Sequence, residues 1–426
     1  MNNLMNVYIE THGCKLNISD SQKISDQLQS SGLNISDDIT SSDIYILNTC
    51  TVTKSADKKA RNKLRNIRKS NPELKIVATG CYAERDSEEI LNLGVVDSII
   101  NNKEKDIFLN KISIDLGINL SKSSNENNIN KILLGRTRAS VAIQKGCNQI
   151  CSYCIVPKVR GREKSIEPEE IIQRISYLES RGCKEVVLTG TQLGTYGYDL
   201  EDINLTNLLK KILDKTNIER LRLSSVQPHE FNKELLLLWE EKKYRSRLCP
   251  HFHIPLQSGS DAILKTMRRK YTTQDFAEIV SVIRNKLENS SITTDLIVGF
   301  PGETDKDHND TKKLLRKLNI SDIHVFPYSI RPGTTAYYLK NKIHPSTITS
   351  RAKEIREIAK DLNIKHLKSL LTTKQNILWE NKRPYSGYTE NYSYFKLIED
   401  KRPIDSISQV IIESIDNENN LIGRLS

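Results

Sequence analysis

Three cysteines lie close together near the middle of the chain, within residues 142–164. Cys147, Cys151 and Cys154 follow the spacing C-x3-C-x2-C. Thiolates are the usual protein ligands of iron–sulfur clusters, so cysteines at this spacing can bind one face of an iron–sulfur cube. The segment contains no fourth cysteine in register, and one iron would therefore remain open to bind another ligand.

Two other interpretations fit part of this motif. Cys151 and Cys154 alone could form a redox-active dithiol or half of a zinc site. A zinc ribbon needs a second CxxC, and a zinc finger needs a nearby pair of histidines, but the next histidine along the chain is His229. The spacing therefore favours an iron–sulfur cluster, with zinc and redox or structural thiols as the alternatives.

Three further cysteines, Cys14, Cys50 and Cys81, each follow a short apolar run in the N-terminal part of the chain. Such runs alternate here with helical segments, which predicts a parallel sheet covered by helices. The expected strands are Asn6–Glu10, Ile44–Asn48, Lys75–Thr79 and Val96–Ile100, and the expected helices are Ser19–Ser31 and Ser55–Ser70. Ligands bind at the carboxyl ends of strands in such sheets, so the three cysteines could converge on one site. Unrelated buried thiols are the alternative.

The central part of the chain predicts a second set of parallel strands. Amphipathic helices such as Pro168–Arg181 and Thr273–Lys286 separate the strand-like runs, and such β/α units are typical of a partial barrel. The runs are Arg138–Gln144, Glu185–Thr189, Arg220–Ser225, His251–Pro255, Thr293–Gly299 and Ile323–Tyr328. The first run leads directly into the Cys147 loop, where the active site of such a barrel is expected.

These patterns predict an α/β protein of three domains. An open parallel α/β domain over 1–117 is followed by an Asn- and Ser-rich linker at 118–132 and a partial (β/α)6 barrel over 133–365. After a helix at Thr347–Leu371, short strand-like runs predict a small β-barrel over 371–426, a fold that often binds nucleic acid. These runs are Asn376–Glu380, Tyr385–Glu390, Ser393–Ile398, Ser408–Ser414 and Leu421–Arg424.

The charge of the chain indicates a polyanionic partner, most simply a nucleic acid. The 426 residues carry a net charge of +11, and residues 118–370 alone have 42 Lys and Arg against 29 Asp and Glu. A basic helix after Cys50 includes Lys58, Arg61 and Arg65. No apolar run is long enough to span a bilayer and no signal peptide is evident, which predicts a cytoplasmic protein without a membrane partner.

The cysteine motif resembles that of the radical S-adenosylmethionine (radical SAM) enzymes, in which Tyr153 would be the typical aromatic residue before the last cysteine. With both cysteine sets considered, the chain resembles the methylthiotransferases of this class over nearly its whole length. The matching blocks are THGCKLNISDS, NTCTVT, TGCYAERD, CNQICSYCIVPKVRGREKS, HIPLQSGSDAILKTMRRKYT and TTDLIVGFPGET. The C-terminal tail resembles the RNA-binding TRAM β-barrel of that family.

The resemblance implies two [4Fe–4S] clusters and SAM as cofactors. Cys147, Cys151 and Cys154 would hold the cluster that reduces SAM to generate a radical at an adenine C2. Cys14, Cys50 and Cys81 would hold an auxiliary cluster that carries the transferred sulfur, and no separate catalytic side chain is expected. A low-potential electron donor such as flavodoxin or ferredoxin and a sulfur source would be partners. Cys183 and Cys249 match no ligand block and are interpreted as ordinary thiols.

The blocks are most similar to the subgroup that adds a methylthio group to C2 of N6-threonylcarbamoyladenosine at position 37 of tRNA. HVFPYSIRPGT and NTCTVTKSADKKAR are among the blocks that favour this subgroup. The same chemistry on isopentenyladenosine of tRNA, or on an aspartate of a ribosomal protein, is the alternative. A zinc-containing RNA-binding protein without catalysis is the competing class.

Further site residues are predicted from their position after the expected strands or beside the cysteine loop. Gln227 stands where the family commonly has Glu, which argues against an acid–base role for that position. The candidates for SAM binding are Tyr153, Gly190, Gln192, Ser225, Gln257 and Asp295. The candidates for RNA binding are Lys58, Arg61, Arg65, Arg160, Arg162 and Lys164.

Overall fold

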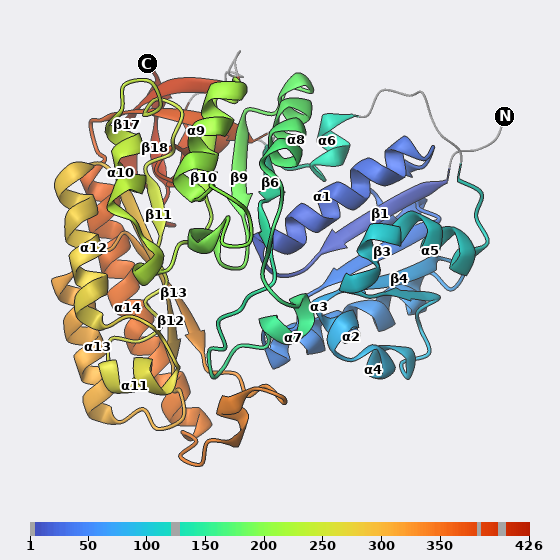
Figure 1. Ribbon diagram of the computed structural model, residues 1–426, viewed down its shortest axis with the longest axis horizontal. Helices are drawn as coiled ribbons and strands as arrows, with labels where there is room; N and C mark the ends of the chain where they lie inside the picture. The colour runs from blue at the N-terminus through green and yellow to red at the C-terminus, as the bar shows by residue number, and fades with distance from the viewer. Residues whose placement is uncertain (1–4, 121–127, 381–384, 399–405) are drawn as a thin grey trace.

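The N-terminal part of the chain forms an open, five-stranded parallel sheet with the strand order β2-β1-β3-β4-β5 (Figure 1). The computed structural model describes residues 5–120, 128–380, 385–398 and 406–426. The elements are β1 (Asn6–Thr11), α1 (Lys15–Ser30), β2 (Asn34–Ile35), η1 (Ile39–Ser41), β3 (Ile44–Thr49), α2 (Lys54–Ser70), β4 (Lys75–Gly80), α3 (Cys81–Arg85), α4 (Ser87–Leu91), β5 (Ser98–Ile100), η2 (Asn102–Ile107) and α5 (Phe108–Leu116). This arrangement confirms the predicted α/β sheet.

The central strand β3 explains why this sheet is easy to recognise from the sequence. Every residue of β3 is buried, because helices cover both faces of the sheet, and its sequence accordingly begins with the apolar run IYIL. α1 and α5 pack on one face, and α2 and α3 pack on the other. The four expected strands correspond to β1, β3, β4 and β5. The two-residue edge strand β2 was not predicted, since it is too short to show a periodic pattern.

The linker expected at 118–132 is only partly a linker. Its residues 121–127 lie outside the described residues. The segment after them forms α6 (Ile129–Ile132), and the hydroxyl of Ser25 in α1 donates to the carbonyl of Lys131 at 2.8 Å. Ile132 is fully buried. The prediction was wrong for 128–132, because the high Asn and Ser content masks two isoleucines on the packed side of one helical turn.

The central part forms six parallel strands in two hydrogen-bonded sheets. β6, β9 and β10 are neighbours in one sheet, and β11, β12 and β13 are neighbours in the other. A parallel bridge between Leu221 and Leu248 leads from β10 toward β11. The six expected strands are thus confirmed as a partial barrel whose core is lined by leucine, isoleucine and valine.

The bounds of the central elements follow closely from the sequence pattern. They are β6 (Arg138–Ala142), β7 (Gln144–Lys145), α7 (Val156–Arg160), β8 (Lys164–Ser165), α8 (Pro168–Ser180), β9 (Glu185–Thr189), η3 (Leu193–Thr195), α9 (Leu205–Lys215), β10 (Arg220–Leu223), η4 (Pro228–Glu230), α10 (Lys233–Glu240), β11 (His251–His253), α11 (Asp261–Thr266), α12 (Thr273–Lys286), β12 (Ser291–Val298), α13 (Asp305–Lys317), β13 (Asp322–Pro327), η5 (Thr335–Tyr338) and α14 (Pro345–Ser369).

Helix α1 of the N-terminal part lies against β6, the edge strand of the central sheet (Figure 1). Its polar side chains satisfy the backbone of this edge: Gln22 Oε1 accepts from Ser140 N at 2.8 Å, and Ser19 Oγ accepts from Ala142 N at 3.0 Å. An uncovered strand edge would present unpaired N–H and C=O groups. The two α/β parts therefore share one interface, and α1 completes the side of the barrel that β6 leaves open.

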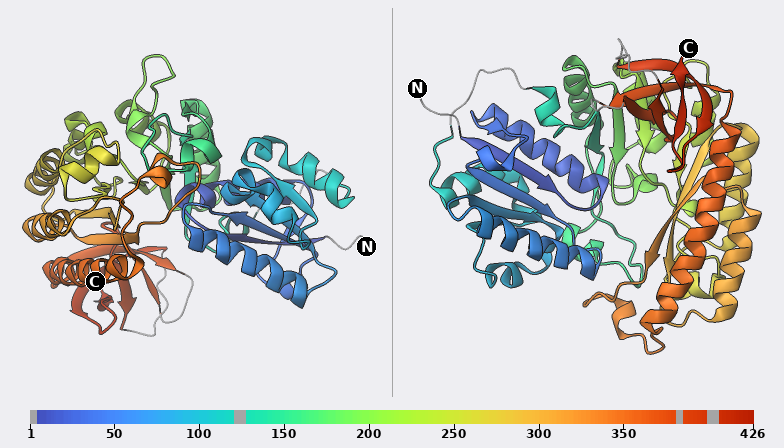
Figure 2. Two further views of the ribbon diagram at one scale, coloured as in Figure 1. Left: turned by 90° about the horizontal axis from the view of Figure 1, so that it is seen from below. Right: turned by 180° about the vertical axis from the view of Figure 1, so that it is seen from behind.

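The C-terminal part is a closed five-stranded barrel at the N-terminal ends of the central strands (Figure 2). Its strands are β14 (Lys374–Glu380), β15 (Ser386–Thr389), β16 (Tyr394–Leu397), β17 (Ile407–Ile415) and β18 (Leu421–Leu425). Arg220 donates to the carbonyl of Asn376 at 2.7 Å, and Arg222 donates to that of Glu390 at 2.8 Å. The predicted small β-barrel is confirmed. Within the described residues, no helix has the length and hydropathy needed to cross a bilayer.

Candidate active site

The structure brings Cys14, Cys50 and Cys81 to one edge of the N-terminal sheet. They follow β1, β3 and β4, which are adjacent parallel strands, so all three cysteines lie at the carboxyl edge. The loops touch: a Cβ added at Gly13, whose φ is +100°, would lie 2.7 Å from Cys50 Cβ. Asn17 holds the loops together by donating to the carbonyls of His12 at 2.7 Å and Thr49 at 2.9 Å.

The surroundings of these cysteines suit iron ligation. Cys14 is exposed, whereas Cys50 and Cys81 are buried, and all eight cysteines of the chain are free thiols. Burial, together with the neighbouring Cys14 and Cys81, raises the pKa of the Cys50 thiol to about 12. Thiolates in such a place need a nearby positive charge, which cluster irons supply. The three thiols therefore fit the auxiliary [4Fe–4S] cluster, with no fourth cysteine beside them.

Arg160 is part of this site rather than of the surface. Its Nε donates to Cys81 Sγ at 3.3 Å, and its Nη1 forms an ion pair with Asp20 at 2.7 Å. Nη2 also donates to Asn17. The side chain is 6% exposed, so the guanidinium is fully engaged inside the protein. Its predicted contact with RNA phosphate is replaced by a contact with a cluster thiol, because Asp20 and Lys105 form a buried charge network around it.

The other RNA-binding candidates divide into exposed and engaged side chains. Arg61 is only partly exposed, and it donates to the hydroxyl of Tyr82 at 2.9 Å and to Glu89 at 2.8 Å. The remaining four are exposed and stay predictions: Lys58, Arg65, Arg162 and Lys164.

The loop of Cys147, Cys151 and Cys154 follows β6 at the carboxyl ends of the central strands. Gly146 begins it with a φ of +68°, and a Cβ there would lie 1.9 Å from the carbonyl oxygen of Arg162, so only glycine fits. The loop is anchored on its far side, where the amide of Ser152 donates to the Met267 carbonyl at 3.0 Å.

Polar side chains contact these thiols directly. Arg269 Nη1 donates to Cys151 Sγ at 3.2 Å, and the Cys147 thiol donates to Gln192 Oε1 at 3.1 Å. Burial raises the pKa of Cys147 to about 11 and that of Cys154 to about 12. Cys147 and Cys154, whose thiols resist ionisation alone, fit a cluster whose irons would hold them as thiolates.

Gln192, a predicted SAM contact, lies beside this loop, and Gly190, another, packs against Gln144. Gln144 Oε1 accepts from the amides of Thr191 at 2.9 Å and Gln192 at 3.0 Å, and it lies 3.0 Å from where a Cβ of Gly190 would be. Gln192 Nε2 in turn donates to Glu230 Oε1 at 2.6 Å. Gly190 therefore leaves room for the Gln144 side chain that fixes the turn.

Glu230 is the acidic residue that sequence reasoning missed. Burial raises the pKa of Glu230 to about 7, and Gln227 donates to it at 3.0 Å. Gln227 stands where the family commonly has Glu, and the structure places the Glu230 carboxyl beside it, from η4 three residues later. The Q-x-x-E spacing across one turn was the available signal. Several buried polar atoms at this site lack a hydrogen-bond partner among the described residues, which fits a polar cofactor. They are Gln149 Nε2 and Oε1, Thr191 Oγ1, Gln227 Oε1 and Glu230 Oε2.

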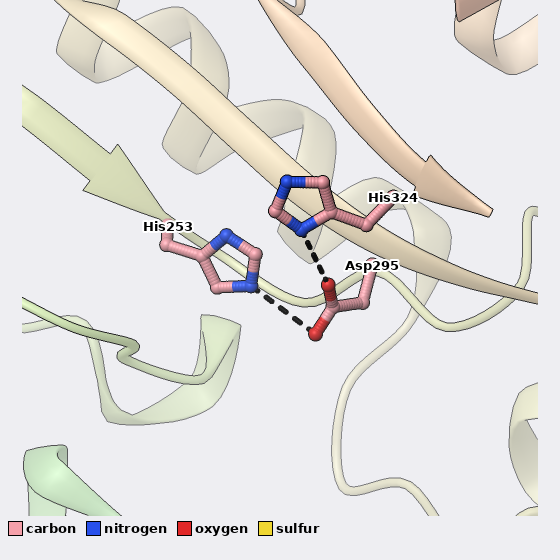
Figure 3. Close-up of side chains that lie close together, drawn as sticks. All are labelled: His253, Asp295 and His324. Carbon is pink, nitrogen blue, oxygen red and sulfur yellow. Dashed lines mark hydrogen bonds and ion pairs between the residues drawn. The ribbon is translucent and has the colours of Figure 1, made fainter. Parts of the chain in front are cut away.

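The remaining SAM candidates lie in different surroundings. Tyr153 packs edge-on against Phe300, with ring centroids 6.4 Å apart, and Ser225 is half-buried after β10. Gln257 has a φ of +65°, and its amide donates to the Asp295 carbonyl at 2.8 Å. The Asp295 side chain is turned to His253 and His324, and both of its carboxylate oxygens contact an imidazole (Figure 3). Its predicted contact with SAM is therefore not supported by its orientation.

A buried ion pair ties the Cys50 loop to the central barrel. Arg331, in the loop after β13, donates to Thr51 at 2.6 Å and forms an ion pair with Asp57 at 2.7 Å. Thr51 follows Cys50 directly in the sequence. Both cysteine loops thus face the interface between the N-terminal sheet and the mouth of the barrel.

Comparison with known proteins agrees with this arrangement. Residues 6–101 match the family described as "Uncharacterized protein family UPF0004", and residues 141–315 match the radical SAM superfamily. Among solved structures, the radical SAM methyltransferase TsrM from Kitasatospora setae is similar in fold, with a TM-score of 0.56 at 14% identity over 78% of this chain and 77% of that one. Fold and site together define a radical SAM enzyme with a second triple-cysteine site.

Proteins of similar sequence show which family of radical SAM enzymes this chain belongs to. A threonylcarbamoyladenosine tRNA methylthiotransferase MtaB from Aquifex aeolicus is 35% identical over 88% of this chain and 95% of the relative. An MtaB relative from Thermotoga maritima is 35% identical over 97% of this chain and 95% of the relative. A tRNA-2-methylthio-N6-dimethylallyladenosine synthase from Dictyoglomus thermophilum is 34% identical over 90% of each. The chain belongs to the radical SAM tRNA methylthiotransferase family, which implies SAM and [4Fe–4S] clusters as its cofactors.

Proposed function

We propose that this protein adds a methylthio group to C2 of N6-threonylcarbamoyladenosine at position 37 of tRNA. The observation that carries the proposal is the pair of triple-cysteine sites that face one interface. The substrate is supported by the relatives named MtaB, which match nearly the whole chain at 32–36% identity. Because tRNA is the substrate, we place the reaction in the cytoplasm.

The two cysteine sites divide the chemistry between them. Cys147, Cys151 and Cys154 would hold one [4Fe–4S] cluster, and Cys14, Cys50 and Cys81 would hold the other. When bound, the clusters and SAM supply the electron, the radical that removes the C2 hydrogen, the sulfur and, from a second SAM, its methyl group. A low-potential electron donor such as flavodoxin or ferredoxin and a source of sulfur complete the proposal.

The protein residues would position and shield these groups. Gln192 and Glu230 offer an amide and a carboxylate beside Cys147, which suits the ammonium group of SAM. Arg269 and Arg160 each place a guanidinium against a cluster thiol, which favours the thiolate form. The Arg331–Asp57 pair fixes the loops on either side of the interface, so that both sites keep their separation.

A second substrate has its own support. Relatives named tRNA-2-methylthio-N6-dimethylallyladenosine synthase match at 33–34% identity, close to the values for the MtaB relatives. An aspartate of a ribosomal protein remains the third alternative from the sequence. The two nucleosides differ in the group on N6, and the third alternative is an amino-acid residue of a protein, so product analysis distinguishes all three.

The test is mass spectrometry of nucleosides from digested tRNA of cells with and without this gene. Loss of the 2-methylthio derivative of threonylcarbamoyladenosine, with accumulation of the unthiolated nucleoside, is the expected result. Complementation with Cys50→Ala or Cys147→Ala should fail, whereas Cys183→Ala, at a buried cysteine away from both sites, should restore the product. Loss of the dimethylallyl product instead would assign the other tRNA substrate, and no change in either would refute a tRNA substrate.

A further inference from the structure

A cavity of about 370 Å³ lies where the three parts of the chain meet. Lys15 enters it from the first turn of α1 and follows Cys14 directly in the chain. His253 and His324 line it from the central strands, and Tyr388 and Tyr392 line it from the C-terminal barrel. The chemistry described so far uses none of these five side chains.

Asp295 binds the two histidines together in this cavity (Figure 3). His253 Nε2 and His324 Nδ1 each lie 3.2 Å from a different oxygen of the carboxylate, and the imidazole rings stack with centroids 5.5 Å apart. Burial would raise the pKa of Asp295, but its bonds to both imidazoles hold it well below its usual range. The carboxylate is therefore ionised and fully occupied, and it orients the two rings.

Lys15 is the cation in this cavity without a fixed partner. Within the described part of the chain, its ammonium makes no hydrogen bond or ion pair, and it lies 5.5 Å from the ring centroid of Tyr392. The nearby Arg222 is neutralised by Glu185 at 2.7 Å. Asp322 Oδ2 lies 3.9 Å from His324 Nε2, and its side chain is 44% exposed to water. Positive charge from Lys15 consequently remains available to a ligand inside the cavity.

The walls of the cavity are polar and aromatic rather than aliphatic. Tyr392 stacks on His251 and on Tyr388, each with ring centroids 5.0 Å apart. The hydroxyls of Tyr388 and Tyr392 have no hydrogen-bond partner among the described residues. Such a lining offers donors to carboxylate, hydroxyl and carbonyl oxygens, and a small aliphatic substituent would leave these donors unpaired.

We infer that this cavity receives the threonylcarbamoyl arm of the modified adenine, and that Lys15 and His324 bind the carboxylate of that arm. The inference rests on the proposed function, and it names the residues that select this substrate. N6 is the amino nitrogen on C6, and C6 and C2 flank N1 in the same ring of adenine, so an arm on N6 begins close to the reacting carbon. A base held beside Cys14 would direct that arm toward Lys15.

The test measures binding of anticodon stem-loop RNAs to the purified holoenzyme. The RNAs carry threonylcarbamoyladenosine, its methyl ester, isopentenyladenosine or unmodified adenosine at the same position. The variants are Lys15→Met and His324→Phe, because phenylalanine keeps a ring beside His253. The matched control is Lys23→Met, at an exposed position on the same helix α1. Iron content is measured on every variant, since Lys15 adjoins Cys14.

The wild-type protein should bind the threonylcarbamoyl RNA about tenfold or more tightly than the ester or the unmodified RNA, as expected for hydrogen bonds to a charged group. Lys15→Met and His324→Phe should lose this preference with normal iron content, and Lys23→Met should keep it. If the wild-type protein keeps the preference and so do both variants, the inference is overturned while the proposed function stands. If the wild-type protein prefers the isopentenyl RNA, the result refutes threonylcarbamoyladenosine as the substrate, on which the inference rests.

One further outcome would assign the histidines differently. His253, Asp295 and His324 offer ligand atoms within 4.8 Å of one another, a spacing compatible with a metal ion. Stoichiometric binding of added Zn²⁺ that is lost in His324→Phe, without any change in RNA preference, would overturn the inference in favour of a metal site.

Discussion

Arg160 and Asp20 form a buried ion pair of 2.7 Å that joins the two cysteine loops. Asp20 lies on α1, one turn after the Cys14 loop, and Arg160 ends α7, which follows the loop of Cys147, Cys151 and Cys154. The same guanidinium reaches Cys81 Sγ at 3.3 Å. A residue that belongs by sequence to the barrel therefore supports the auxiliary site.

Replacing Arg160 with methionine should remove the auxiliary cluster selectively. Asp20 would keep only Lys105 as a charged partner, and breaking a buried pair of this kind costs about 3–5 kcal/mol. Iron should fall from about eight to about four atoms per chain, since each cluster holds four. The control is Lys105→Met, which alters the Asp20 pair without touching Cys81 and should retain more iron. If Arg160→Met keeps its full iron content but binds tRNA more weakly, the result would support the contact of Arg160 with RNA phosphate that was predicted from the sequence.

Arg162 and Lys164 are exposed beside the cysteine loop, and reversing both charges should weaken tRNA binding. The slope of log affinity against log salt should fall by about one for each lost phosphate contact. The measurement is tRNA affinity at several salt concentrations, together with iron content, which should not change. Lys69→Glu, at the far end of α2 from the cysteines, is the control and should bind normally. Equal weakening in the control would mean that overall charge, and not this surface, governs affinity.

Glu230→Gln should stabilise the fold at alkaline pH. Burial raises the pKa of Glu230 to about 7, whereas this carboxyl has an ordinary pKa of 4.5 in the unfolded chain. The neutral carboxyl therefore stabilises the fold at low pH, and this contribution is lost as the pH rises toward 7. Gln imitates the neutral form, so the free energy of unfolding should rise by about 1–3 kcal/mol at pH 8 and change little at pH 4. Urea unfolding of the cofactor-free protein at both pH values measures this difference. An equal change in the free energy of unfolding at both pH values would indicate an effect of packing instead of charge.

Arg222→Leu should destabilise the contact between the central and C-terminal barrels. Arg222 is fully buried between Glu185 and the backbone carbonyls of Thr389 and Glu390. Its removal leaves the Glu185 carboxylate with only the longer contact to Arg220, at 3.6 Å, which costs about 3 kcal/mol or more. The double variant Glu185→Leu with Arg222→Leu should recover part of this loss. Denaturant midpoints report both effects, and a single variant as stable as the wild type would contradict the account.

The strands were the part of the fold most easily predicted from the sequence. β9 and α12 have the predicted bounds, because buried parallel strands and amphipathic helices leave strong patterns. β2 and α6 were missed or misassigned, since two- and four-residue elements are too short for any period. The spacing of Cys147, Cys151 and Cys154 favoured a cluster by itself, whereas strand order left Cys14, Cys50 and Cys81 open to being unrelated thiols until the family resemblance was considered; the structure places these three at the carboxyl edge of one sheet.

The side-chain partners at the site could not be predicted in the same way. Arg160 looked like a surface cation because its partner Asp20 is 140 residues away in the sequence. Asp295 looked like a cofactor ligand because it lies on a central strand, but its direction depends on His253 and His324 from neighbouring strands. Such pairings arise only when distant elements pack, and a single sequence contains no periodic signal for them.

The capping of the β6 edge by α1 has a consequence for synthesis at the ribosome. The chain emerges from its N-terminus, so the sheet that carries α1 is complete before β6 has left the exit tunnel. Ser19 and Gln22 are then already in place to receive the backbone of β6 as it appears. A strand edge that could pair with another nascent chain is covered from its first exposure. The order of the two α/β parts along the chain thus protects the later one from misassembly.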